Sequence, residues 1–277
     1  MGVINLTPDS FSDGGRIAGM EQAVRVAARM VAQGADVLDL GGQSTRPGAE
    51  EVGPQRELER LLPALEAIRA AHPGVTLSVD TFHAQVAEVA LAAGADWIND
   101  VRGVNGRDPG MLPLIARIGC PYVLMHSRGD SRSMDALAVY GDVVAEVRGE
   151  LEAATAAALE DGVRGEQILW DPGLGFAKTT GQNLELLRRL PELGGLGPGQ
   201  VPIPYPLLVG PSRKRFIGAV LEEPRPRARL WGTAAVCALA VARGAAVLRV
   251  HDVGPIAQVV RMAAAVVDEG PLSGACR

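Results

Sequence analysis

The 277-residue chain contains little cysteine, with three residues of this type. Cys120, Cys237 and Cys276 lie far apart and form neither a CxxC pair nor a Cys/His set with the spacing of a zinc site. A disulfide framework in a small domain needs a denser, even-numbered set of cysteines. These absences argue against a disulfide-stabilised domain and a structural zinc site, and they fit a reducing compartment.

The chain also lacks an apolar run of the roughly 18 to 20 residues that a membrane-spanning helix requires. The segment 234–250 comes nearest, but Arg243, Gly244 and Arg249 interrupt it. No charged and apolar leader precedes the first expected strand, so we expect no secretory signal and a cytoplasmic location. The formal net charge of −5 offers no basic excess for nucleic acid or an anionic membrane surface. An anionic substrate would therefore need a local basic cluster.

The sequence is instead rich in short apolar runs that end on a polar or charged residue, and there are eight of them. Stretches rich in Ala, Leu and Val, with helical spacing, separate successive runs. Eight strand-helix units favour closure into a (β/α)8 TIM barrel over an open, doubly wound sheet. We expect one domain over residues 1–269 and a C-terminal tail over 270–277. The expected strands are 1–6, 37–41, 76–80, 97–100, 122–126, 168–171, 207–214 and 247–252, and the expected helices are 20–33, 54–71, 84–93, 109–118, 143–159, 183–190, 230–243 and 256–268.

Polar residues end several of these strands, and in a barrel the carboxyl ends of all strands converge on one mouth. Asp80, Asn99, Asp100 and Asp171 end three of the strands. One such residue most often caps the next helix, but three strands supply a ring of polar groups. Such a ring suits the amidine-like edge of a heterocycle, where N–H donors lie side by side, or a divalent metal; spacing alone leaves both open. Asp39 is interpreted as structural.

Two loops at the mouth have a composition that suits ligand contact. Asn5 ends the first strand, and the polar, glycine-flanked loop after it carries Phe11. This loop either caps the next helix or forms a lid that lays an aromatic face over a flat substrate. The second loop, 41–48, combines glycines and hydroxyl groups with Arg46, as an anion site would. An ordinary surface cation is the alternative for Arg46.

A basic cluster follows the seventh strand and continues on the eighth. Lys214 and Arg215 belong to the first part, and Arg249 and His251 belong to the second. The ends of these two strands form the frequent phosphate site of the fold. Two cations buried inside a barrel without partners would be costly, so we expect an anionic ligand such as a diphosphate, with a neutral, structural His251 as the alternative. His126, at the end of the fifth strand, is interpreted as structural.

Eight segments of the chain, taken together, resemble one family. The segments NLTPDSFSDGG, GGQSTRPG, SVDT, INDV, MH, DPGLGFAK, GPSRKRFIG and LRVHDV are similar to those of the dihydropteroate synthase family and occur in its order. The resemblance implies a folate-pathway transferase that condenses 6-hydroxymethyl-7,8-dihydropterin diphosphate with p-aminobenzoate, with Mg2+ as cofactor. Ring electrons can stabilise a cationic methylene, so we expect a dissociative substitution. A pterin-binding methyltransferase of the corrinoid systems and a non-catalytic pterin-binding homologue are the alternatives.

The resemblance also implies roles for individual residues. The chain departs from the family at Arg215, where many members have Ser, and at Gln43 and Gln182, where Glu and His are common. It also opens directly on the first strand, without the short segment that members carry before it. The apolar helical segment 234–241 suggests a homodimer. The implied site comprises Asp80, Asp171, Lys214 and Arg249 for catalysis; Asp80, Asn99, Val101, Met125, Asp171, Phe176 and Lys214 for the pterin; Asn5, Arg249 and His251 for the diphosphate, with Asn5 for Mg2+; and Phe11, Thr45, Arg46, Pro47 and Arg215 for p-aminobenzoate.

Overall fold

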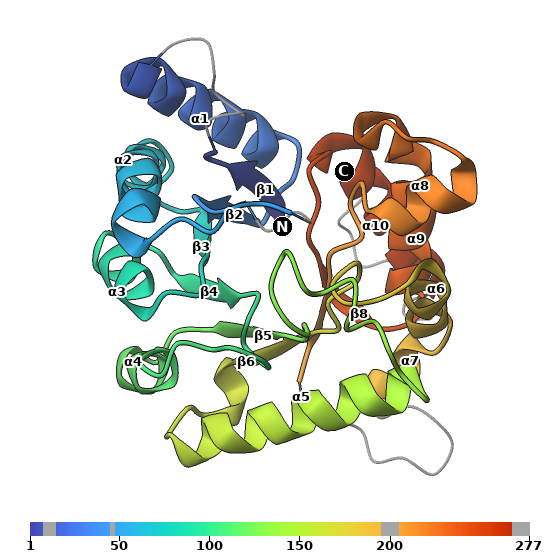
Figure 1. The fold of residues 1–277 in the computed structure, drawn as a ribbon. Helices are drawn as coiled ribbons and strands as arrows, with labels where there is room; N and C mark the ends of the chain where they lie inside the picture. The colour runs from blue at the N-terminus through green and yellow to red at the C-terminus, as the bar shows by residue number, and fades with distance from the viewer. Residues whose placement is uncertain (8–14, 45–47, 195–204, 268–277) are drawn as a thin grey trace.

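An eight-stranded parallel sheet forms the centre of the molecule (Figure 1). The computed structural model describes residues 1–7, 15–44, 48–194 and 205–267. The strands pair in chain order, and a parallel bridge between Gly2 and Val250 joins the end of the sheet to its beginning. The strands are β1 (Gly2–Asn5), β2 (Val37–Gly41), β3 (Thr76–Asp80), β4 (Trp97–Asp100), β5 (Tyr122–Met125), β6 (Ile168–Asp171), β7 (Leu207–Val209) and β8 (Ala245–Leu248).

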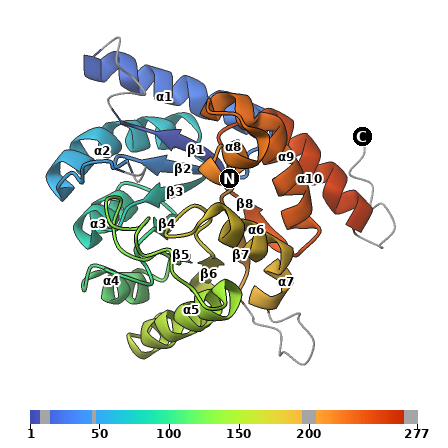
Figure 2. The same ribbon diagram turned by 45° about the vertical axis from the view of Figure 1, so that its right-hand side comes forward.

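Helices alternate with these strands and lie outside the sheet (Figures 1 and 2). The arrangement is consistent with the expected (β/α)8 barrel. None of the described helices is long and apolar enough to cross a bilayer. The helices are α1 (Gly15–Ala32), α2 (Pro54–Ala71), α3 (Ala84–Ala92), α4 (Met111–Ile118), α5 (Val143–Glu160), α6 (Thr180–Arg188), α7 (Leu190–Leu193), α8 (Arg215–Leu221), α9 (Leu230–Val241) and α10 (Val253–Val267), with 3-10 turns η2 (Gly165–Gln167) and η3 (Pro226–Arg229).

Local sequence signals fix where several helices begin. Pro54 is the first residue of α2, a position that needs no N–H donor. The Asp142 carboxylate accepts the N–H groups of Val144 and Ala145 at 2.9 and 3.1 Å and caps α5. The Thr179 hydroxyl caps α6 in a capping box. These signals explain why α2 and α5 begin where the sequence predicts.

Two expected strands are wrong in their bounds near the end of the barrel. β7 stops at Val209 rather than at residue 214, because Pro211 has no N–H group to continue the pairing. β8 spans Ala245–Leu248 rather than 247–252, so Arg249 and His251 follow the strand instead of ending it. The Arg249 N–H still donates to the Val209 carbonyl at 3.0 Å. The backbone therefore continues the pairing just beyond the strand, which brings Arg249 to the same mouth.

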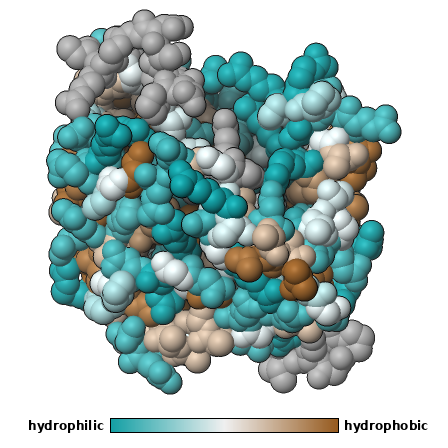
Figure 3. All heavy atoms as spheres, viewed as in Figure 1, coloured by the Kyte–Doolittle hydropathy of each residue, from teal (hydrophilic) through white to brown (hydrophobic). Residues whose placement is uncertain are grey.

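The strands are largely buried on both faces, as their nearly continuous apolar sequences predict. Outward side chains such as Leu40 and Val79 join the main apolar core, which includes buried residues of the surrounding helices. On the face shown in Figure 3, hydrophilic residues predominate and apolar ones form small groups. A separate inner cluster fills the barrel itself and comprises Val123, Leu169 and Leu208, with Met1, Trp97 and Val247 packed against it.

Asp100 lies on the opposite face of β4 from Asn99, because successive residues of a strand point to opposite faces. The Tyr122 hydroxyl donates to Asp100 Oδ2 at 2.7 Å, and the Arg102 N–H donates to Oδ1 at 2.8 Å. Burial raises the pKa of Asp100 to about 6, while these hydrogen bonds oppose the shift. Including Asp100 in the polar ring was therefore wrong; its carboxylate is part of the packing between the strands and the outer layer.

Tyr122→Phe tests this structural role. The change removes only the hydroxyl and leaves a fully buried carboxylate with one donor fewer. We expect the free energy of unfolding to fall by about 1–3 kcal/mol, the usual result of leaving a buried acceptor unsatisfied. Urea unfolding followed by circular dichroism measures the change. An unaltered midpoint and slope would show that the Tyr122–Asp100 hydrogen bond contributes nothing to stability.

Candidate functional site

The strand register brings polar side chains together at the carboxyl ends of β1 to β6. Asn5 pairs with Gly41, Gly41 with Asp80, and Asp80 with Asn99. Residues directly paired on neighbouring parallel strands point to the same face of the sheet. Asn5, Asp80 and Asn99 therefore share the inward face of the mouth, and Gly41 between them adds no side chain. Asp171, the last residue of β6, also faces inward and pairs with Met125 of β5.

Arg249 lies at the centre of this group. Its Nε donates to Asp39 Oδ2 and its Nη2 to Asp80 Oδ2, each at 2.6 Å. The argument that Arg249 is an unpaired buried cation was therefore wrong, since two carboxylates compensate its charge. Asp39 lies one layer deeper, paired with Val3 and with Ser78, and it is fully buried. This agrees with the prediction that Asp39 is structural, because its carboxylate fixes the Arg249 guanidinium from inside the barrel.

Three groups of the mouth, Asp80, Asp171 and Lys214, have pKa values shifted towards the neutral form. Burial raises the pKa of Asp80 to about 7; Asp39 adds to the shift, while Arg249 opposes it. Burial also raises the pKa of Asp171. Burial, and then repulsion by Arg249, lower the pKa of Lys214 to about 8. Clusters of shifted pKa values on several converging strands are typical of functional sites.

Asn99 contributes an unsatisfied acceptor to the same group. Its side chain is 2% exposed, and Oδ1 has no hydrogen-bond partner within the described parts of the chain. A buried amide oxygen without a donor is costly, by about 1–3 kcal/mol. A ligand that presents an N–H group to Asn99 would remove this cost. Asp80, Asn99 and Asp171 together thus offer hydrogen-bond acceptors to a ligand that carries several N–H donors along one edge.

His251 and Asn5 lie together on the β8–β1 side of the mouth. His251 Nε2 is 3.5 Å from Asn5 Nδ2, and its Nδ1 is 3.0 Å from the Ser212 hydroxyl. Burial, together with the charges of Arg213 and Arg249, lowers the pKa of His251 to about 3. A pKa this low makes His251 neutral near pH 7. A neutral imidazole can still donate a hydrogen bond to an anion.

Phe176 and Lys214 form the opposite wall. The Lys214 ammonium lies 4.2 Å from the centroid of the Phe176 ring, a cation–π contact. Phe176 packs against a small apolar cluster of Phe82, Val101 and Met125. The mouth thus combines a polar floor with an apolar wall. A flat, polar-edged ring is the ligand shape that such a combination suits.

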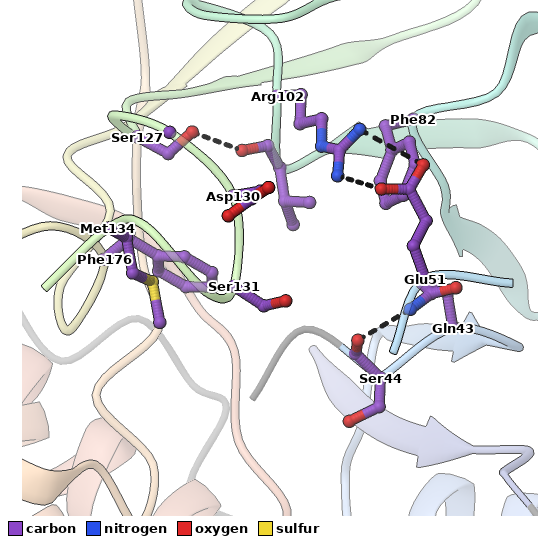
Figure 4. A pocket seen from close by; sticks show the side chains of 12 residues that line it. Gln43, Ser44, Glu51, Phe82, Arg102, Ser127, Asp130, Ser131, Met134 and Phe176 are labelled. Atoms are coloured by element: carbon purple, nitrogen blue, oxygen red, sulfur yellow. Dashed lines mark hydrogen bonds and ion pairs between the residues drawn. The ribbon is translucent and has the colours of Figure 1, made fainter. Parts of the chain in front are cut away.

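A hollow opens beside this wall, as Figure 4 shows. Arg102 closes one side of it, with its guanidinium 3.8 Å from the Phe82 ring and in a double hydrogen bond to Glu51 at 2.6 and 3.3 Å. Phe82 and Arg102 are not among the site residues predicted from the sequence. Both directly follow motifs identified there, SVDT and INDV, so their position after a strand end was the available signal. The hollow is lined by Gln43, Ser44, Glu51, Phe82, Val101, Arg102, Ser127, Gly129, Asp130, Ser131, Met134 and Phe176.

The residues expected to contact p-aminobenzoate are described only in part. Arg215 begins α8, is exposed, and forms an ion pair with Asp135 at 2.6 Å. Next to the second loop, the Gly48 N–H donates to the Ser131 carbonyl at 2.9 Å, and the Ser131 hydroxyl donates to the Ala49 carbonyl at 2.8 Å. Arg215 and the end of the second loop both contact the segment after β5. Four other expected residues lie outside the described part of the chain: Phe11, Thr45, Arg46 and Pro47.

A magnesium ion at this mouth would have few protein ligands. The described residues contain no group of three or more His, Cys, Asp or Glu side chains that could enclose a metal. Mg2+ usually keeps several waters and binds through one or two protein oxygens plus substrate phosphates. The carboxamide oxygen of Asn5 is a ligand of this type, while its Nδ2 is the atom that lies next to His251.

Glu57, in the first turn of α2, is a buried acid that the sequence analysis did not single out. Its side chain is 0% exposed, and both carboxylate oxygens have no hydrogen-bond partner within the described residues. It lies behind Gly42, where an added Cβ would come within 3.1 Å of Glu57 Cγ, and its Oε2 is 3.9 Å from His83 Nε2. Burial raises the pKa of Glu57 from 4.5 to about 7.

Glu57→Gln predicts a change in the pH dependence of stability. Between pH 4.5 and 7 the folded protein keeps the Glu57 proton that the unfolded chain releases. The stability contributed by this group is therefore fully present below pH 4.5 and is lost as the pH rises through about 7. Relative to the variant, the wild type should lose about 2–3 kcal/mol over this range. Urea unfolding at stepped pH values measures it, and parallel curves for the two proteins would contradict the shift.

The chain is similar to a known family and to several known proteins over nearly its whole length. The family described as pterin binding enzyme matches residues 1–251. The dihydropteroate synthase of Synechocystis is 48% identical over 95% of this chain and 88% of its own length. A Xanthomonas albilineans dihydropteroate synthase solved with 4-aminobenzoic acid is 44% identical, with a TM-score of 0.86 over 96% of this chain and 92% of that one. The same enzyme solved with 7,8-dihydropteroate is 41% identical, with a TM-score of 0.83 over 96% and 92%.

These likenesses define first a pterin-binding enzyme on an eight-stranded barrel. More narrowly, the chain belongs to the dihydropteroate synthase family. The resemblance of the eight segments is thereby confirmed. The relatives support neither a corrinoid-system methyltransferase nor a non-catalytic homologue.

Proposed function

We infer that this protein is a transferase that condenses 6-hydroxymethyl-7,8-dihydropterin diphosphate with p-aminobenzoate, giving 7,8-dihydropteroate and diphosphate. Its family membership and its relatives over nearly the full chain support this reaction. Solved relatives carry 4-aminobenzoic acid and 7,8-dihydropteroate, which are one substrate and the product of the same reaction. The active site is the mouth formed by the carboxyl ends of the strands.

The unsatisfied oxygen of Asn99 is the observation that favours a pterin most directly. A pterin presents several N–H donors along one edge, and Asn99 lies between Asp80 and Asp171 in the order of the strands. Lys214 would donate to the pterin carbonyl. Its cation–π contact with Phe176 places both side chains beside the bound pterin ring. The apolar side chains expected to contact the ring faces are Val101, Met125 and Phe176.

The diphosphate end of the substrate would lie against Arg249, His251 and Asn5. Arg249 supplies the positive charge, and the neutral His251 supplies a hydrogen bond. Mg2+, held by the Asn5 oxygen and the substrate phosphates, would supply further charge for the leaving group. Electrostatic stabilisation of this kind is effective because it acts where negative charge develops.

The Arg249–Asp80 ion pair links the two ends of the substrate. In the free site Asp80 Oδ2 accepts from Arg249 Nη2 at 2.6 Å. When pterin N–H groups become the donors to Asp80, one N–H of Nη2 becomes available to the diphosphate, while Nε and Nη2 both stay 2.6 Å from Asp39 Oδ2. Binding of the ring would thus free a donor of Arg249 for the leaving group.

The second substrate has a neutral aniline nitrogen at working pH, so its attack requires no strong base. We expect departure of diphosphate to leave a methylene cation that the ring electrons and the carboxylates of Asp80 and Asp171 stabilise. Phe11, Thr45, Arg46 and Pro47 would enclose p-aminobenzoate and exclude water, which would otherwise trap the cation. Arg215 would bind its carboxylate after leaving Asp135.

Diphosphate release tests this function directly. Release should require both the dihydropterin diphosphate and p-aminobenzoate and should equal the dihydropteroate formed. Diphosphate release at the same rate without p-aminobenzoate, or no release with both substrates present, would overturn the assignment.

Asp80→Asn, assayed in the same way, tests the site. The amide has no negative charge for Arg249 and presents an NH2 donor in place of one acceptor oxygen, so kcat/KM should fall at least about 100-fold, or about 3 kcal/mol. Asp100→Asn is the matched control, because Asp100 ends the next strand but points away from the mouth. Its kcat should stay within about threefold of wild type. Equal losses in both variants would show that the effect comes from folding rather than from the site.

We also propose that two copies of the chain associate through α9 and α10, which pack side by side (Figures 1 and 2). Trp231 and Leu239, two turns apart on α9, are 78% and 52% exposed, and Met262 and Val266, one turn apart on α10, are 65% and 72% exposed. Large apolar side chains aligned on two adjacent helices are typical of a protein interface.

Sedimentation velocity tests this association. The wild type should sediment as a dimer of the 28.9-kDa chain, and the double variant Leu239→Arg/Met262→Glu should sediment as a monomer. Two charges in the centre of an apolar interface would remain unpaired and desolvated. Leu159→Arg, an exposed apolar residue of α5, should leave the dimer intact. A monomeric wild type would disprove the proposal.

A further inference from the structure

The loop between β6 and α6 has an unusual backbone. Gly173, Ala177 and Gly175 all have positive φ angles, of 65°, 48° and 78°. Glycine adopts this region freely, but an alanine there costs roughly 1–2 kcal/mol. A Cβ at Gly173 would also overlap the His126 carbonyl oxygen, so the loop packs closely onto the end of β5. Such a backbone persists only where its surroundings hold it.

The Lys178 side chain is placed to hold this loop. Although it is a lysine, it is 7% exposed. Its Nζ contacts three acceptors: His126 Nδ1 at 2.9 Å, the Phe176 carbonyl at 3.0 Å and the Gly173 carbonyl at 3.2 Å. An ammonium group has three N–H donors, and here each has an acceptor. Burial lowers the pKa of Lys178 to about 7, while in the charged form each of its N–H donors has an acceptor, so the ammonium form prevails below that pH.

The partners behind His126 fix its role as an acceptor. His126 Nε2 is 3.1 Å from Glu150 Oε2, and Glu150 is also bound by Arg128. The hydrogen bond from His126, together with Arg128, lowers the pKa of Glu150 to about 2, so this group is a carboxylate. A carboxylate only accepts, so His126 donates from Nε2 and presents the lone pair of Nδ1 to Lys178. Burial and the charge of Lys178 lower the pKa of His126 to about 4, which keeps it neutral.

The groups that Lys178 holds are attached to the mouth. The Phe176 carbonyl precedes the strained Ala177, and the Phe176 ring carries the contact to Lys214. The Gly173 N–H donates to Asp171 Oδ1 at 2.7 Å, so the turn at Gly173 also orients Asp171. Movement of the loop would therefore displace both the apolar wall and one of the pterin acceptors.

The composition of the chain supports a specific need for lysine here. The sequence contains 25 arginines and two lysines, and these are Lys178 and Lys214. A compact ammonium group directs three donors from one atom, whereas a guanidinium spreads its donors over a plane. Of the two lysines, Lys214 lies in the mouth and Lys178 supports the loop beside it.

We propose that Lys178 is a positioning residue for the reaction, whose ammonium group fixes the β6–α6 loop so that Phe176 and Asp171 face the substrates. This proposal rests on the proposed function for its effect on turnover. Lys178 touches neither substrate in this scheme and acts through Phe176 and Asp171.

Hydrogen exchange and NMR test the support without any substrate. The wild type, labelled with 15N-lysine, should show a protected ammonium signal at pH 6.5 that disappears in Lys178→Met. Amide exchange of the segment 172–179 should become at least tenfold faster in this variant. Lack of an ammonium signal from Lys178, or unchanged exchange in the variant, would overturn the proposal, even if the protein proved to have a different activity.

Kinetics then test whether the support acts through Phe176. Lys178→Met should lower kcat/KM for p-aminobenzoate at least 30-fold, and Lys178→Arg should not restore it. Arg188→Lys, an exchange of the same residue types on the exposed face of α6, is the control and should stay within twofold. In a Phe176→Leu background, the further loss from Lys178→Met should be clearly smaller than 30-fold and should represent only the part transmitted through Asp171, because coupled residues are non-additive.

Fully multiplied losses in the double variant would assign Lys178 a general structural role and contradict the proposal. If Lys178→Met does not fold, Lys178→Gln retains two N–H donors and takes its place in both tests. If wild-type turnover requires other substrates while the exchange and NMR results hold, the proposed function fails and the support of the loop stands.

Discussion

The guanidinium of Arg249, bound between the carboxylates of Asp39 and Asp80, is the interaction on which the mouth depends. It joins the end of the last strand to β2 and β3, beside the point where the sheet closes between Gly2 and Val250. A buried charge is tolerated only when partners compensate it, and removing one partner usually costs about 3–5 kcal/mol. The polar floor of the barrel thus remains stable inside an apolar protein because its charges balance each other.

Much of the fold could be predicted, because strands buried on both faces leave a clear pattern. The expected bounds of β2, β3, β4 and β6 are confirmed, since each is a short apolar run ended by a polar residue or glycine. β8 was placed two residues late because its first residues are alanines, which have little preference for strands. Pairing with a neighbouring strand, which no local pattern reveals, decides such a boundary.

The site could be predicted as a set of residue types, but not as a set of partners. Successive side chains of β4 point to opposite faces, so Asn99 and Asp100 have different surroundings. The hydroxyl that donates to Asp100 belongs to Tyr122 on the neighbouring strand. Arg249 is 210 residues from Asp39 and 169 from Asp80 along the chain, so no spacing rule connects them. Glu57 and Lys178 escaped notice for a similar reason, since burial gives them their unusual properties, and burial belongs to the tertiary structure.

Compensation within the mouth also constrains what can bind there. Because Arg249 already has carboxylate partners, a simple anion would have to compete with Asp39 and Asp80 for it. A ligand that offers N–H donors to Asp80 and an anion to Arg249 replaces both halves of the ion pair at once. A heterocycle joined to a diphosphate has both parts in one molecule, and it also satisfies the unpaired oxygen of Asn99. The balance of charges therefore favours the complete substrate over either of its ends alone.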